Sequence, residues 1–257
     1  MRTAVSLNTR LREGAALTAV FVIIPSTHVV EMIGIAGFDA VIIDMEHGPF
    51  SIDSLIPLIL AAKARDMYPI VRVRANDPAL IGAALDAGAA GLLVPQVTSA
   101  AAAAAVVQAA RFAPDGARGT NPWVRAANYG AAPGWFAEAN RDVSVMVMIE
   151  GREGLAALDE IVAVQGLDGI FLGPVDMAQS LGVGGQPEHT KVIEAMRATI
   201  ATASARHLAT AVFAPTSAAA KRWLGLGVRV IALSEDAVVM MDAFRRLKQD
   251  LDQGGFR

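Results

Sequence analysis

Eight short runs rich in valine and isoleucine recur along this chain of 257 residues, and each is followed by a longer, amphipathic, alanine-rich stretch. Strands that alternate with helices in this way form a parallel sheet covered by helices. We predict strands at residues 18–24, 38–45, 68–74, 91–97, 144–150, 168–174, 209–215 and 229–235. Eight such units in a chain of this length fit one closed (β/α)8 barrel of the α/β class, a TIM barrel in a single domain spanning residues 1–257. An open doubly wound sheet is the alternative.

The boundaries of the predicted helices carry residues that cap helices. Ser, Thr or Asp stands just before the periodic runs, where its side chain can accept hydrogen bonds from the free N–H groups of a first turn. Glycine follows several runs, as is typical of helix C-termini. These residues are Ser26, Ser51, Asp77, Ser99 and Thr216 at the starts, and Gly37, Gly88, Gly166 and Gly227 at the ends. Two longer connections, residues 113–143 and 177–190, are candidates for functional loops.

Composition limits the partners and the chemistry of the chain. It is 54% hydrophobic and 18% charged, which predicts a large folded core. The absence of cysteine excludes disulfides, thiolate catalysis and cysteine-bound zinc, and it agrees with a cytoplasmic location. The most apolar run, AALTAVFVII, falls short of the roughly 18 residues that cross a membrane. A net charge of -3 gives no basic field, so we expect no nucleic acid and no membrane as partner.

Ionisable residues gather where the predicted strands end. The stretch FDAVIIDMEHGPF places Asp44, Glu46 and His47 directly after the second apolar run. Arg72, Arg74, Gln96, Glu150, Asp176, Glu235 and Asp236 stand at the ends of other strands. Because the active site of a (β/α)8 barrel lies at the C-terminal ends of its strands, these residues are candidates for a shared site.

The best candidate metal ligands are Glu150 and Asp176, which follow neighbouring strands. Carboxylate oxygens are the ligands that Mg²⁺ or Mn²⁺ prefers when one or two carboxylates and several waters complete an octahedron. Taken singly, each carboxylate could instead cap the N-terminus of a helix.

His47 and Arg72 are candidates for acid–base work and for anion binding. A lone histidine is often a structural hydrogen-bonding residue, but the company of arginine and carboxylates from other strands favours proton transfer. An arginine inside a barrel mouth is costly unless it has a partner, and an anionic ligand would provide one. Lys63, Lys191, Lys221 and Lys248 all fall within predicted helices, so the mouth has no lysine for a Schiff base, and electron withdrawal would fall to a metal.

Five ordered motifs carry a family resemblance. FDAVIIDMEHGPF, PIVRVRANDP, LDAGAAGLLVPQV, MIEGREGL and DGIFLGPVDMAQSLG, which together span nearly the whole chain, resemble the HpcH/HpaI family of class II 2-keto-3-deoxy acid aldolases. The resemblance implies a (β/α)8 barrel that is a homo-oligomer, typically a hexamer, in which the C-terminal helix, residues 236–253 here, is exchanged between subunits.

The resemblance also implies roles for individual residues. Glu150 and Asp176 would bind a divalent cation (Mg²⁺, Mn²⁺ or Co²⁺), and Arg72 would lie beside the keto oxygen of the substrate. His47 would be the base, paired with Asp86, and Asp44 would hold the rim together. The backbone around Gly173, Pro174, Val175 and Asp176 would receive the substrate carboxylate, in agreement with anion binding at a helix N-terminus.

The implied reaction is the reversible cleavage of 4-hydroxy-2-keto acids to pyruvate or hydroxypyruvate and an aldehyde, through a metal-stabilised enolate. The chain departs from the family at Met148, where glutamine is common, in the loop 118–123, and at Phe213. These departures concern the substrate range, and we expect Phe213 to help set it if its ring faces the mouth. The alternatives are a CoA-ester lyase of the malyl-CoA or citryl type, whose chains are usually longer, and a metabolite-binding barrel without turnover.

Overall fold

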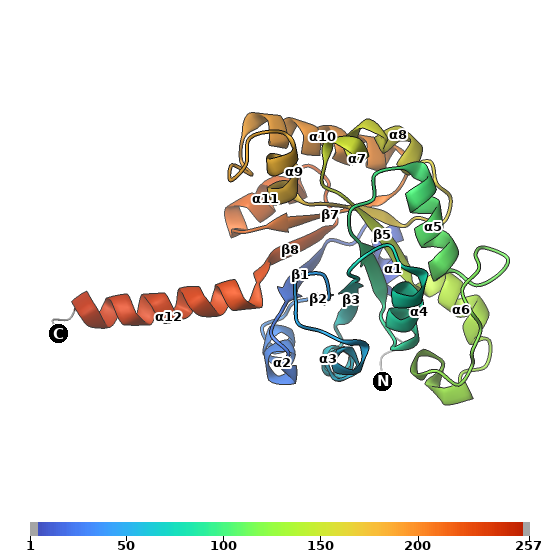
Figure 1. The fold of residues 1–257 in the computed structure, drawn as a ribbon. Coiled ribbons are helices and arrows are strands. Elements are labelled where there is room, and N and C mark those ends of the chain that lie inside the picture. The colour runs from blue at the N-terminus through green and yellow to red at the C-terminus, as the bar shows by residue number, and fades with distance from the viewer. Residues whose placement is uncertain (1–4, 254–257) are drawn as a thin grey trace.

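Eight parallel strands close into one barrel in the computed structural model, which describes residues 5–253. Figure 1 shows the strands at the centre, with helices around them. The strands are β1 (Leu17–Val22), β2 (Ala40–Asp44), β3 (Tyr68–Arg72), β4 (Gly91–Val94), β5 (Ser144–Ile149), β6 (Gly169–Leu172), β7 (Ala209–Ala214) and β8 (Val230–Glu235). Each strand pairs with the next, and β8 pairs with β1, so the predicted (β/α)8 barrel is confirmed and the open sheet is excluded.

Five of the helices begin at the predicted caps. Ser26, Ser51, Asp77, Ser99 and Thr216 each accept a hydrogen bond from a backbone N–H of the first turn. The helices are α2 (Thr27–Ile35), α3 (Ile52–Ala64), α4 (Pro78–Asp86), α5 (Ala100–Ala110), α7 (Arg152–Ala156), α8 (Leu158–Ile161), α9 (Pro174–Ser180), α10 (Thr190–Ala205), α11 (Ser217–Gly225) and α12 (Asp236–Gln253). The long connection 113–143 holds the 3₁₀ helix η1 (Arg125–Gly130) and α6 (Trp135–Asp142).

A further helix at the start of the chain, α1 (Leu7–Arg12), was not predicted from the sequence. Leu7 and Leu11 are buried in the same apolar cluster as the inward-facing residues of the barrel. That cluster includes Leu17 at the beginning of β1, so α1 covers the end of the barrel at which the strands start. With this end filled by apolar side chains, the opposite end is left as the place for polar chemistry.

The core has two parts because neighbouring strand residues point to opposite faces of the sheet. Ile42, Ile70 and Leu93 lie in the cluster inside the barrel. Ile43 and Val71 lie in the larger cluster between the strands and the helices. Side chains on the inner face therefore reach the mouth only at the last residue of a strand or just beyond it.

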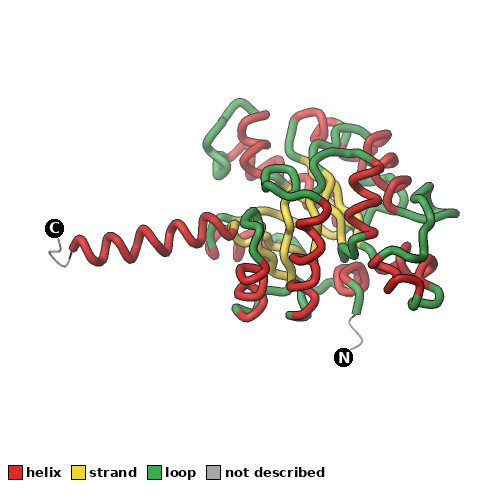
Figure 2. The backbone as a smooth tube through the Cα atoms, turned by 60° about the horizontal axis from the view of Figure 1, so that its bottom comes forward, coloured by secondary structure: helices red, strands yellow, loops and turns green. Residues whose placement is uncertain are grey.

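The last helix, α12, does not pack along the barrel but projects away from it, as Figures 1 and 2 both show. Large apolar side chains along it, among them Phe244 and Leu247, are exposed. None of the helices within residues 5–253 has the length and apolar character that a membrane span requires.

Candidate active site

A buried ion pair joins the ends of two neighbouring strands. Asp44 and Arg72 are the last residues of β2 and β3 and lie side by side in the register of the sheet. The two Asp44 oxygens accept hydrogen bonds from Arg72 Nε at 2.7 Å and Nη2 at 2.6 Å. Asp44 Oδ1 also accepts from the backbone N–H groups of Glu46 (3.0 Å) and His47 (3.4 Å). This carboxylate therefore fixes both the guanidinium and the turn that carries Glu46 and His47.

The rest of the Arg72 side chain faces the barrel mouth. Its Nη1 lies 3.1 Å from Glu46 Oε2 and 4.0 Å from the sulfur of Met148, and its guanidinium carbon lies 4.9 Å from the centre of the Phe21 ring. Burial alone would lower the pKa of Arg72, but the bonds to Asp44 and the nearby carboxylates raise it. Arg72 is thus a fixed, permanent cation in the mouth.

Glu150 and Asp176 come together over Gly173. Glu150 follows β5, and Asp176 lies in the first turn of α9, after β6. A Cβ atom added to Gly173 would lie 3.2 Å from Glu150 Oε2 and 3.5 Å from Asp176 Oδ2, so glycine leaves the space that the two carboxylates use. Burial raises the pKa of Glu150, and the charges of Asp176 and Glu46 raise it further. The charge of Asp176 therefore disfavours the ionisation of Glu150.

Gln96 positions Glu150 through its backbone. The Gln96 N–H donates to Glu150 Oε1 at 2.7 Å, and the residue adopts a positive φ of 56° after β4. Its side-chain amide donates to Glu46 Oε1 at 3.3 Å. Burial raises the pKa of Glu46, while Arg72 and His47 lower it. The carboxylates of Glu46 and Glu150 are therefore both held by contacts from neighbouring strands.

His47 stands at the open edge of the mouth. Its side chain is 70% exposed, and its Nε2 lies 3.9 Å from Glu46 Oε2. It lines two adjoining cavities, one of about 300 Å³ and one of about 260 Å³, which also share Asp176. The larger cavity is also lined by Phe21, Arg72, Met148, Gly173, Pro174, Val175, Phe213 and Glu235, and the smaller one by Glu46, Gln96 and Glu150. The imidazole is free to meet a substrate in either cavity.

Phe213 faces the inside of the barrel mouth. Its ring centre lies 6.1 Å from that of Phe21, edge to face, and both rings line the larger cavity. Together with Met148 they form an apolar wall on one side of a site that is otherwise charged.

Asp86 lies apart from the other candidates. It ends α4, which runs from the mouth back to the opposite end of the barrel, and its Oδ1 accepts a hydrogen bond from Arg118 Nη2 at 2.6 Å. The implied pairing of His47 with Asp86 is therefore not formed within the chain. The carboxylate beside His47 is that of Glu46.

Several residues of the mouth were not given a role from the sequence. Glu46 was noted in its motif but unassigned, and Gln96 acts through its backbone N–H, which no side-chain pattern reveals. Glu235 was noted only as a strand end, and Phe21 was counted only as part of an apolar run. The strand register that brings Phe21 and Glu235 side by side is a tertiary feature.

The closed barrel, with its charged side chains gathered where the strands end, defines a (β/α)8-barrel enzyme. Residues 17–243 match the family model described as HpcH/HpaI aldolase/citrate lyase. The chain is 36% identical over 217 residues to a 5-keto-4-deoxy-D-glucarate aldolase of Klebsiella pneumoniae, covering 84% of this chain and 85% of the relative.

Two solved structures are similar over nearly the whole chain. One, an HpcH/HpaI aldolase/citrate lyase family protein from Burkholderia cenocepacia J2315, has a TM-score of 0.91 at 34% identity and covers 96% of this chain and 98% of that one. The other, the citrate synthase SbnG, has a TM-score of 0.89 at 31% identity, with 98% and 99% covered. The chain belongs to the HpcH/HpaI aldolase/citrate lyase family, and it is an enzyme of the aldolase type.

Replacing Arg72 by lysine tests the importance of the fixed guanidinium. We expect Arg72→Lys to lower kcat/KM for aldol cleavage by about 100-fold, because one ammonium cannot bond both Asp44 oxygens and also present charge to the mouth. Arg74→Lys is the matched control, since Arg74 bonds the backbone oxygens of Met45 and Phe50 instead. Equal kcat/KM in wild type and Arg72→Lys would remove Arg72 from the reaction.

Proposed function

We propose that the protein reversibly cleaves a 4-hydroxy-2-keto acid to pyruvate or hydroxypyruvate and an aldehyde, using a divalent cation (Mg²⁺, Mn²⁺ or Co²⁺) held by Glu150 and Asp176. The observation that carries the proposal is the convergence of these two carboxylates over Gly173, in a mouth that also contains Arg72. The small-molecule substrates and a cytoplasmic location belong to the same proposal.

The residues present fit a divalent cation. Both ligands are hard carboxylate oxygens, and Gly173 leaves open the space where a side chain would push them apart. Within residues 5–253 no group of three or more His, Asp or Glu side chains is arranged to hold a metal ion. A cation bound by Glu150 and Asp176 would therefore take further ligands from water and substrate, as Mg²⁺ commonly does. When bound, it would withdraw electrons from the keto oxygen of the substrate.

Arg72 and the start of α9 would bind the keto acid. Arg72 is held by Asp44 and faces the larger cavity, so its charge can act on the keto oxygen without rearrangement. Gly173, Pro174 and Val175 line the same cavity at the N-terminus of α9, where no side chain caps the helix. We assign the substrate carboxylate to this end, because backbone N–H groups there favour an anion.

His47 would move the proton. In cleavage it takes the proton of the C4 hydroxyl as the C3–C4 bond breaks, the aldehyde carbonyl forms, and the bonding electrons remain on the keto acid half as an enolate. In synthesis it returns that proton to the new hydroxyl group. Its exposure and its place in both cavities support this role, and the Glu46 carboxylate lies 3.9 Å from its Nε2.

The two alternative functions, a metabolite-binding barrel and a CoA-ester lyase, have less support. A binding barrel closed by Met148 and Phe213 does not agree with the cavity of about 300 Å³ that these residues line. Release of pyruvate from a 4-hydroxy-2-keto acid, with no CoA ester present, separates an aldolase from a CoA-ester lyase.

Removal of the metal should stop the reaction. We expect EDTA to abolish pyruvate release and Mg²⁺, Mn²⁺ or Co²⁺ to restore it, because the lysines all lie on helices away from the mouth. Glu150→Ala and Asp176→Ala should lose metal binding in calorimetry while keeping the wild-type circular dichroism spectrum. Glu153→Gln, on the exposed side of α7, is the control for loss of one negative charge. Full activity in EDTA would contradict the proposed dependence of the reaction on a divalent cation.

Loss of the imidazole should separate binding from bond cleavage. We expect His47→Ala to slow cleavage by about 100-fold or more, the usual effect of removing a general base. Metal binding and pyruvate binding should stay near wild-type values, since His47 contacts neither Glu150 nor Asp176 through a hydrogen bond or ion pair. A variant that turns over at the wild-type rate would assign the proton transfer to another group.

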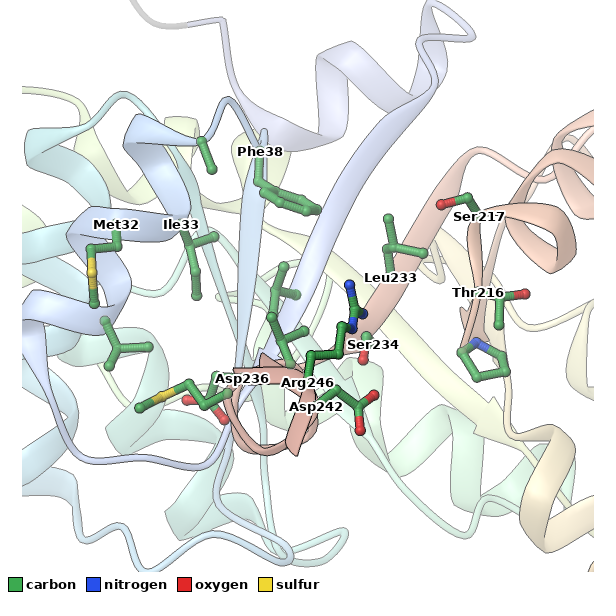
Figure 3. A pocket seen from close by; sticks show the side chains of 16 residues that line it. Met32, Ile33, Phe38, Thr216, Ser217, Leu233, Ser234, Asp236, Asp242 and Arg246 are labelled. Carbon is green, nitrogen blue, oxygen red and sulfur yellow. The ribbon is translucent and has the colours of Figure 1, made fainter. Parts of the chain in front are cut away.

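We also propose that α12 (236–253) is exchanged between subunits of an oligomer, a hexamer according to the family resemblance. Met240, Phe244, Leu247 and Leu251 recur every three or four residues along α12 and are exposed. Where a helix following β8 would pack, between α2 and α11, lies a mostly apolar cavity of about 580 Å³, which the first turns of α12 also line. Figure 3 shows Met32, Ile33 and Phe38 on one side of this cavity and Leu233 and Thr216 on the other.

The mass of the protein in solution tests whether α12 joins subunits in this way. We expect light scattering to give an assembly of several subunits for the wild type, and a smaller species for Phe244→Asp, which places a charge in the apolar stripe of α12. Gln249→Asp, which adds the same single negative charge on the exposed side of α12 away from Phe244, is the control. A wild-type protein that is monomeric at micromolar concentration would contradict the exchange.

A further inference from the structure

The end of β8 is irregular, and this irregularity turns a carboxylate into the barrel mouth. Val230 and Ala232 face the barrel interior, so alternation would make Ser234 the next inward residue. Instead, Ser234 has a positive φ of 63°, and the pairing of β8 with β1 shifts so that Glu235 lies opposite Phe21. Ser234 lines the outer cavity between α2 and α11 (Figure 3), and Glu235 lines the mouth. Bulges of this kind re-aim side chains beside active sites.

Asp236 fixes this arrangement. It is 4% exposed, and its two oxygens accept hydrogen bonds from the backbone N–H groups of Ile23 and Ile24, each at 3.1 Å. The residue after Glu235 is thus tied to the segment that follows β1. Glu235 is held between this contact and its pairing with Phe21, so its position does not depend on a flexible loop.

Glu235 has no protein partner within residues 5–253. Its carboxylate forms no hydrogen bond or ion pair there, whereas Asp44, Glu46 and Glu150 each have at least one. The other carboxylate of the mouth without such a partner among the described residues is that of Asp176, which is already assigned to the metal. Glu235 shares the larger cavity with His47, Arg72, Phe21 and Phe213. A carboxylate that is held in a cavity and left free is available to a ligand.

Barrel geometry indicates which part of a substrate would meet Glu235. In the closed order β1 to β8, β1 lies four strands and β8 three strands away from β5, so Phe21 and Glu235 stand on the side of the mouth away from Glu150. The keto acid half is assigned to Glu150, Asp176 and Arg72. The half beyond the bond that breaks then extends toward the wall formed by Phe21, Phe213 and Glu235.

We propose that Glu235 selects the aldehyde: a neutral aldehyde that carries a hydroxyl group is accepted, and one that carries a carboxylate is disfavoured. The hydroxyl donates a hydrogen bond to Glu235, whereas a second carboxylate meets a like charge beside two phenyl rings. This inference rests on the proposed aldolase function. The proposed preference for a neutral aldehyde differs from what the name of the 5-keto-4-deoxy-D-glucarate aldolase implies, because a glucarate carries a carboxylate at each end.

Two aldehydes of equal size test the selection. Glycolaldehyde and glyoxylate each have two carbons and differ in a hydroxymethyl group against a carboxylate. Burial raises the pKa of Glu235, so the assay uses pyruvate and Mg²⁺ at about pH 8, well above the ordinary carboxyl pKa of about 4.3, to keep this group ionised. We expect the wild type to favour glycolaldehyde in kcat/KM by at least about tenfold. Glu235→Gln keeps the shape, removes the charge, and should move the ratio toward glyoxylate by about tenfold. Glu153→Gln should leave the ratio unchanged.

A binding measurement gives the same answer without turnover. Of two keto acids with the same chain length, 2-oxoglutarate has a distal carboxylate and 2-oxopentanoate has a methyl group. Calorimetry with Mg²⁺ present should show that Glu235→Gln binds 2-oxoglutarate about tenfold more tightly than the wild type does and binds 2-oxopentanoate equally well. If Glu235→Gln fails to fold, the wild-type preference for 2-oxopentanoate over 2-oxoglutarate still tests the selection.

Two assay outcomes distinguish an error in the selection by Glu235 from an error in the aldolase function. Product formed equally from both aldehydes, with the same ratio in Glu235→Gln, overturns the selection and leaves the aldolase in place. No product from pyruvate with either aldehyde, in the presence of metal, overturns the proposed function and the selection with it.

Discussion

The buried ion pair between Asp44 and Arg72 is the contact on which the rest of the mouth depends. A guanidinium in a barrel interior is tolerated only when a carboxylate satisfies it in good geometry, and the register of β2 and β3 places these two side chains next to each other. The same carboxylate accepts hydrogen bonds from the backbone N–H groups of Glu46 and His47. One acidic residue therefore sets the position of a cation and of the turn that carries the base, so a small error in strand pairing would displace all of them together.

Negative charge dominates this end of the barrel. Glu46, Glu150, Asp176 and Glu235 line the two cavities together with Arg72, which is itself paired with Asp44. The pKa values of Glu46, Glu150 and Glu235 are all raised, with burial as the largest cause. Such an arrangement is unfavourable for the protein alone, and a divalent cation would relieve it. The apolar side chains of Phe21, Met148 and Phe213 add to the effect, because they displace water that would otherwise screen these charges.

The barrel and the polar residues at its rim could be predicted from the sequence because both follow from local patterns. Strand and helix periodicity, with caps such as Ser51 and Asp77, determines the order of the elements, and the C-terminal end of a strand is a position that can be read directly. Three features depended on tertiary contacts instead. The backbone N–H of Gln96 that holds Glu150 leaves no trace in side-chain chemistry, and Asp86 lies at the far end of α4 with Arg118 as its partner. The positive φ of Ser234 arises where β8 meets β1, and no glycine marks it.

Asp236 has two roles in the fold. Its carboxylate ties β8 to the segment after β1, and it is also the first residue of α12, the helix that leaves the barrel. A single peptide bond thus separates the side chain that borders the substrate cavity from the arm that reaches outward (Figure 1). In the proposed oligomer, a displacement of α12 would be transmitted to Glu235 through Asp236, so the proposed assembly and the proposed choice of aldehyde would be coupled at this residue.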